Sequence, residues 1–106
     1  MPTTAKVLGQ TGDASSEVDL YTVPSATISK FKVIVVNRDT SDATFTIAVV
    51  PDGGVTGDAN YIAFNEPIIG SHSVTSTTLT ADAADVIRVQ SSTSMVSFSA
   101  IGLEQS

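Results

Sequence analysis

The chain has 106 residues, a net charge of −6 at neutral pH, and neither cysteine nor tryptophan. Five basic residues against eleven acidic ones cannot neutralise nucleic-acid phosphates or bind an anionic membrane surface, so we expect neither partner. Without cysteine there is no disulfide, thiolate nucleophile or cysteine zinc site. The length is enough for one domain that buries its own core.

Short apolar runs that alternate with serine and threonine recur along the chain, separated by turns rich in Gly, Pro, Asn and Asp. A half-buried strand needs this period of two, and several such runs indicate a sandwich or a barrel. The first half contains candidate strands at 5–9, 17–23, 30–36 and 43–51. In the strand at 17–23, Val18 and Leu20 are expected to face one way and Tyr21 the other.

The run at 30–36 is the most apolar, with Phe31, Val33 and Val35 on one face and Ile34 and Val36 on the other. Apolar residues on both faces indicate a central strand covered on both sides, within the sandwich or by a partner subunit. In the run at 43–51 the residues expected to face the core are Phe45, Ile47 and Val49.

The second half begins with the loop 51–60, followed by candidate strands at 61–64, 73–80, 86–90 and 94–104. In the last of these, Val96, Phe98 and Ala100 are expected to complete the core. No segment keeps a helical apolar stripe for three turns. The sequence therefore predicts a single all-β domain, an antiparallel β-sandwich of about eight strands. Residues 1–10 form an N-terminal arm or first strand, and residues 11–106 form the sandwich.

Few residues could carry chemistry. His72 is the only histidine and lies between two serines, without the nucleophile and carboxylate that a triad requires. The loop residues Asp52, Asp58 and Asn60 could offer oxygens to calcium, but their spacing is not that of an EF-hand, so a plain hairpin loop is favoured. The glycines of this loop lack the lysine and the helix of a phosphate loop.

Two pairs of carboxylates, Asp39 with Asp42 and Asp82 with Asp85, could in principle serve glycoside hydrolysis. Each pair lies in a turn, where aspartate usually accepts hydrogen bonds from the backbone. We therefore expect no catalytic, cofactor or metal site, and interpret the chain as a non-enzyme.

Four segments carry a resemblance to a known group of proteins. They are YTVPSATISKFKVIVVNRDTSDATFTIAVVPDGG (Tyr21–Gly54), NYIAFNEPI (Asn60–Ile68), DVIRVQSS (Asp85–Ser92) and VSFSAIGLE (Val96–Glu104). Together they resemble small virion proteins of tailed bacteriophages over residues 18–104. The shared patterns are strands and turns, so they indicate a type of fold more directly than a role.

This resemblance implies a jelly-roll sandwich and a structural component of the particle. The role it favours is a capsid decoration or cement protein that stabilises the head through contacts between subunits. A neck, tail, baseplate or fibre component, with or without binding to host-surface glycans, is the alternative. The expected partners are other copies in a homotrimer and a major capsid, tail or neck protein. Residues 1–10 lack a signal-peptide pattern, so synthesis in the bacterial cytoplasm is expected before assembly into the virion.

The candidate partner-binding residues lie mainly in and around NEPIIG, which has the pattern of an apolar tip between polar turns. They are Tyr61, Phe64, Pro67, Ile68 and Ile69, together with Lys6 in the N-terminal segment. The competing interpretation is that Ile68 or Ile69 simply caps one end of the core.

Overall fold

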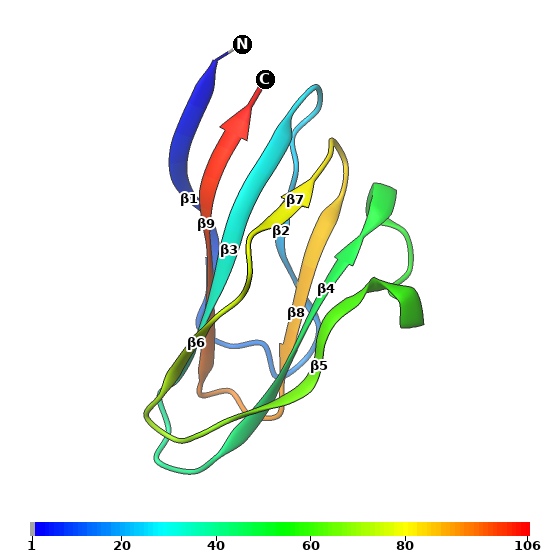
Figure 1. Cartoon of the computed structure of the whole chain (residues 1–106). Coiled ribbons are helices and arrows are strands. Elements are labelled where there is room, and N and C mark those ends of the chain that lie inside the picture. The colour runs from blue at the N-terminus through cyan, green and yellow to red at the C-terminus, as the bar shows by residue number, and fades with distance from the viewer. Residues whose placement is uncertain (1) are drawn as a thin grey trace.

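The computed structural model describes residues 2–106, which form nine strands and two 3₁₀ turns (Figure 1). In chain order the elements are β1 (Thr3–Thr11), β2 (Val18–Thr22), β3 (Ile28–Asn37), β4 (Ala43–Val50), η1 (Pro51–Gly53), η2 (Asp58–Asn60), β5 (Tyr61–Ile68), β6 (Ser73–Thr75), β7 (Leu79–Ala81), β8 (Val86–Ser91) and β9 (Val96–Gln105).

The strands form two antiparallel sheets that face each other. Sheet A has the order β1-β9-β3-β6, with β7 also paired to β3, and sheet B has the order β2-β8-β4-β5. When β6 and β7 are counted as one interrupted strand, this is the strand order of a jelly roll. The predicted all-β sandwich is therefore confirmed, and the predicted strand at 73–80 is the one that divides in two.

The core lies between the sheets and contains the apolar residues that period-two alternation placed there. Phe31, Val33 and Val35 of β3 are buried, as are Val96, Phe98 and Ala100 of β9. Phe45 and Ile47 of β4 are also buried, while Val49 packs against the core with partial exposure. The rings of Phe45 and Phe98 meet edge to face across the sandwich, with centroids 6.5 Å apart.

Tyr21 is buried, which corrects the expectation that it faces away from Leu20. The pairing of β2 with β8 shifts between Asp19 and Tyr21. Such a bulge inserts an extra residue and turns two successive side chains toward the same face. Leu20 and Tyr21 therefore both enter the core.

The break between β6 and β7 has a local cause. At Ser76 the side chain replaces part of the strand ladder: its hydroxyl accepts a hydrogen bond from the Val33 amide at 2.9 Å. The Ser76 amide donates to the Val33 carbonyl at 2.9 Å. These two hydrogen bonds give the Val33 amide and carbonyl partners at the point where regular pairing of β6 with β3 ends.

The strand β3 is central in sheet A, but only one of its faces is covered. Lys32 on its outer face is exposed, and Ile34 and Val36 are half-buried. The sequence predicted that both faces of this strand would be covered, within the sandwich or by a partner subunit. The sandwich itself covers only the inner face.

Residues 3–11 form β1, which pairs with β9 from Thr3↔Gln105 to Thr11↔Phe98. Met1, the first residue of the predicted arm at 1–10, lies outside the described residues. The Ser106 amide donates to the Pro2 carbonyl at 3.1 Å, so the start of β1 and the end of β9 lie side by side (Figure 1). Over residues 2–106, no helix is both long and apolar enough to cross a bilayer.

Candidate functional site

An open groove of about 560 Å³ lies on sheet A and includes all three lysines of the chain. We call it the lysine groove. The residues that line it belong to β1, β3, β9 and the segment before β7: Lys6, Lys30, Lys32, Thr78, Ile101 and Leu103. Phe31 and Gly102 also line it.

Strand register explains why charged and apolar side chains alternate across this groove. Lys30 pairs with Leu103, and Lys32 pairs with Ile101, so each lysine stands beside an apolar neighbour. Residues directly opposite each other on antiparallel strands have their Cβ atoms about 5 Å apart. Val7 of β1 continues the row beyond Ile101 and is 52% exposed.

Gly102 brings β3 and β9 unusually close at the groove. A Cβ at this position would lie 2.1 Å from the Lys30 carbonyl oxygen and 2.5 Å from the Phe31 Cα. Any side chain here would therefore push the two strands apart. The groove floor is bare backbone at this point.

A chain of polar contacts joins the two sheets beside the groove. The Tyr21 hydroxyl donates to Glu104 Oε2 at 2.5 Å, and the Ser29 hydroxyl lies 2.6 Å from the Tyr21 oxygen. The other Glu104 oxygen lies 3.3 Å from Lys6 Nζ. This arrangement ties β2 of sheet B to β1, β3 and β9 of sheet A.

The pKa values of this group follow from burial and hydrogen bonding. Burial, together with the hydrogen bond to Glu104, raises the pKa of Tyr21 to about 12. The hydrogen bond from Tyr21 lowers the pKa of Glu104, and Lys6 lowers it further. The group therefore stays fixed as neutral tyrosine beside ionised glutamate, which suits a structural tie.

The predicted apolar tip is divided between surface and core. Phe64 is 59% exposed and Ile69 is 60% exposed. Pro67 is also exposed, whereas Tyr61 is half-buried. The rings of Tyr61 and Phe64 pack together with centroids 4.8 Å apart.

Ile68 is 1% exposed, so the interpretation that it caps the core is the one the structure supports. Its carbonyl accepts a hydrogen bond from Asn37 Nδ2 at 3.1 Å, and the same amide group donates to the Ser41 carbonyl at 2.9 Å. Asn37 is itself buried. Ile68 is thus removed from the set of exposed interface candidates.

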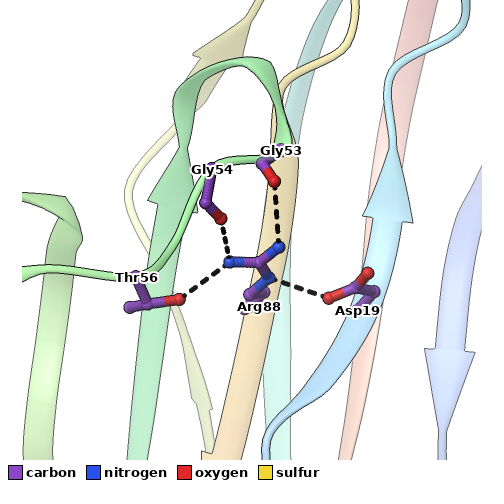
Figure 2. A network of polar contacts seen from close by, with 5 residues as sticks. All are labelled: Asp19, Gly53, Gly54, Thr56 and Arg88. Carbon is purple, nitrogen blue, oxygen red and sulfur yellow. Dashed lines mark hydrogen bonds and ion pairs between the residues drawn. The ribbon is translucent and has the colours of Figure 1, made fainter.

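The loop between β4 and β5 is fastened to sheet B by Arg88 (Figure 2). Arg88 Nε donates to Asp19 Oδ1 at 2.8 Å, and Nη1 donates to the Gly54 carbonyl at 2.6 Å and to Thr56 Oγ1 at 3.1 Å. Beneath this loop, Val50 and Val86 are buried on the outer face of sheet B.

The residues considered for catalysis make ordinary turn contacts. His72 is exposed, and its Nδ1 lies 2.8 Å from the Gly70 carbonyl. The Asp42 carboxylate accepts from the Gly70 amide, and the Asp85 carboxylate accepts from the amides of Asp52 and Asp82. Within residues 2–106, no three His, Asp or Glu side chains come together as a metal site would require.

Sequence reasoning included Lys6 but missed Lys30, Lys32, Ile101 and Leu103. Alternation around Phe31 and Ala100 could have placed all four on the outer faces of their strands. What it could not supply is the pairing of β3 with β9, which joins residues about 70 positions apart in the chain. That pairing is what turns separate outward-facing side chains into one groove.

No protein-family model matches this chain, and no curated protein matches it. One similar solved structure is the crystal structure of a pentameric capsid protein isolated from metagenomic phage sequences. The two chains share 20% identity with a TM-score of 0.45, over 97% of this chain and 60% of that one. This chain thus spans about three-fifths of the length of that capsid protein, and the likeness concerns the fold alone.

The expectation of a homotrimer is corrected by this comparison, since the similar capsid protein is pentameric. The trimer followed only from the resemblance of the strand segments, and no residue pattern in the sequence specified three subunits. We do not retain it.

Proposed function

We propose that this protein is a non-enzymatic structural subunit of a tailed-phage particle, and that it decorates and stabilises the head. The observation that carries the proposal is the number of large apolar side chains left exposed around a well-packed jelly roll. They lie on the outer face of sheet A and along the β5 and β6 edges: Val7, Ile28, Ile62, Phe64, Ile69, Val74 and Ile101.

Exposed apolar side chains gathered on one face or edge mark interaction surfaces, whereas scattered single ones need no explanation. Here Val7 and Ile101 are neighbours on paired strands. A cleft of about 230 Å³ also opens between the β5 and β6 edges, lined by Ile62 and Val74 above the core residues Phe45 and Ile47. These features support a protein that works by packing against neighbours. The resemblance of four sequence segments to small phage virion proteins supports the same role.

The mechanism is interfacial. Copies on a particle bury these apolar faces, and open strand edges can add backbone hydrogen bonds to a neighbour. Permanent interfaces of this kind commonly bury about 2,000 Å² or more in total. The favourable free energy of association comes mainly from apolar area removed from water, at about 25 cal/mol per Å². The entropy and desolvation costs of association reduce this value.

The test uses particles of the phage that encodes the chain. Purified heads and tails are separated, and the protein is quantified in each by mass spectrometry. We expect it on heads in copy numbers comparable with the main head subunit. Heads that lack it should release DNA at a lower temperature, and adding the purified protein should restore the original temperature.

A matched variant sharpens this test. Phe64→Ser with Ile69→Ser removes two exposed apolar side chains and should reduce the restoration. Thr22→Ala, at an exposed position on the opposite edge of sheet B, should not. Absence from purified particles would refute the structural role. A low copy number of the protein, found only on tails, would assign it to the tail or neck and refute the head-decoration role. Specific binding on a glycan array would indicate a fibre module.

A further inference from the structure

The lysine groove places Lys30 and Lys32 together on the outer face of sheet A in a negatively charged molecule. All three lysines of the chain line it, although the net charge is −6. The two arginines are engaged elsewhere, Arg88 with Asp19 and the β4–β5 loop, and Arg38 with the carbonyls of Gly12 and Ser94. Lys6 is paired with Glu104. Within residues 2–106, Lys30 and Lys32 form no ion pair.

The chemistry of the groove defines what it can bind. Its apolar strip, Ile101 and Leu103, lies between the strands that carry Lys6 and the Lys30–Lys32 pair. Lys32 and Lys30 lie directly opposite Ile101 and Leu103, whereas Lys6 is already paired with Glu104. An occupant must therefore bring an exposed apolar side chain with carboxylates close to it. Lys30 and Lys32 are two residues apart on one strand face, which separates their Cα atoms by about 7 Å.

The β4–β5 loop of the same chain has this composition. Val55 is 94% exposed, the most exposed of the large apolar side chains described. Asp52 and Asp58 flank it, both are exposed, and within residues 2–106 neither forms an ion pair. The loop contains no lysine or arginine that would oppose binding to the groove.

The loop is also held in place before any partner arrives. Arg88 binds the carbonyls of Gly53 and Gly54 and the hydroxyl of Thr56, on either side of Val55 (Figure 2). A segment that is already ordered loses less conformational entropy on binding. Val55 is thus presented by a fastened loop.

The groove and the loop lie on opposite sheets, so one molecule cannot fill its own groove (Figure 1). We infer that the lysine groove of one copy binds the β4–β5 loop of a second copy, with Val55 against Ile101 and Leu103 and with Asp52 and Asp58 near Lys30 and Lys32. Such a contact joins different surfaces on the two partners, and repeats into a ring or an open chain. This inference rests on the proposed structural role, because it names the surface through which copies associate.

The test measures self-association of the purified protein by sedimentation velocity over a range of concentrations and salt. We expect assemblies larger than a dimer that weaken as added salt screens the charges. Lys30→Glu with Lys32→Glu, and separately Asp52→Lys with Asp58→Lys, should each weaken association about tenfold or more. All four positions are exposed, so folding should survive, which circular dichroism and thermal unfolding will verify.

Mixing the two charge-reversed proteins gives the decisive result. Each groove then meets a loop of opposite charge on the other protein, so the mixture should regain assembly that neither variant shows alone. Val55→Ser should also weaken association, while the matched change Met95→Ser, at an exposed apolar residue outside the groove, the loop and the apolar surfaces named above, should not.

Three results would overturn the inference. They are a monomer at all concentrations, unchanged assembly in both charge-reversed variants, or loss of assembly with Met95→Ser but not with Val55→Ser. A monomer would mean that the lysines only keep an open sheet face from aggregating. None of these results decides whether the protein belongs to a particle, since that depends on its presence in purified heads.

Discussion

Ile68 and Ile69 are neighbours in the sequence but differ in exposure, at 1% and 60%. Replacing Ile68 with alanine should remove core contacts and leave a cavity, lowering the free energy of unfolding by about 2–5 kcal/mol. Ile69→Ala is the matched control and should change it by no more than about 0.5 kcal/mol. Urea unfolding measures both values. Equal effects would show that Ile68 is not a core residue.

Tyr21 should make stability depend on pH in the alkaline range. Its pKa is raised to about 12 in the folded protein, against about 10 for an ordinary tyrosine. The unfolded chain therefore releases the Tyr21 proton first as the pH rises. The contribution of the protonated Tyr21 hydroxyl to the free energy of unfolding is complete below about pH 10 and is lost as the pH approaches 12.

The measurement is urea unfolding at a series of pH values for the wild type and Tyr21→Phe. The difference between the two proteins isolates the tyrosine from other groups that titrate there. This difference in the free energy of unfolding should decrease steadily between about pH 10 and 12. In a Tyr61→Phe background, ultraviolet titration should place the ionisation of the remaining tyrosine near 12. A midpoint near 10 would contradict the buried, hydrogen-bonded hydroxyl.

The close pairing of β3 with β9 depends on one residue, Gly102. Alanine at this position would place its Cβ 2.1 Å from the Lys30 carbonyl oxygen, so the strands must separate. We expect Gly102→Ala to lower the free energy of unfolding by about 3 kcal/mol or more. Gly12→Ala provides the control, because nothing lies within 4 Å of a Cβ there. If thermal unfolding finds the two variants alike, the strands are not held this close.

Regular strands could be predicted from the sequence, and irregular ones could not. Alternation placed Phe31, Val33 and Phe98 in the core because a regular strand keeps its period of two. Tyr21 was misplaced because a bulge in β2 breaks that period, and the bulge depends on pairing with a distant strand. The same limit applies to the lysine groove, whose two sides come from β3 and β9.

The predicted partner-binding residues also divide into those whose exposure the sequence could predict and those whose exposure it could not. Phe64 and Ile69 were predicted from local composition, and the structure leaves both exposed. Ile68 could not be separated from Ile69 in this way. Its burial depends on β4 pairing, Ala43↔Ile68, and on the Asn37 side chain 31 residues earlier.

At the scale of the whole molecule, charge and apolar surface are unevenly distributed. The lysines line one groove on sheet A, whereas exposed aspartates occupy the turns and the β4–β5 loop. A molecule with net charge −6 repels its own copies at long range, so association requires specific local complementarity. The proposed groove-and-loop contact would provide it.

The jelly-roll order makes the first strand essential to the whole fold. The first strand, β1, covers the edge of β9, and Leu8 within it packs against the core, so the strand belongs to the sandwich and is more than an arm. Deleting residues 1–11 would expose the β9 edge and part of the core. We expect the melting temperature to fall by roughly 10–20 °C, or cooperative unfolding to disappear.

Deleting residues 1–2 alone is the control, because it leaves β1 intact and should change the melting temperature little. Differential scanning calorimetry distinguishes the two deletions. An arm that only reached a neighbouring subunit would contribute to assembly but not to the stability of the isolated domain. Unchanged melting after deletion of residues 1–11, with loss of self-association, would therefore assign β1 to the interface and remove it from the fold.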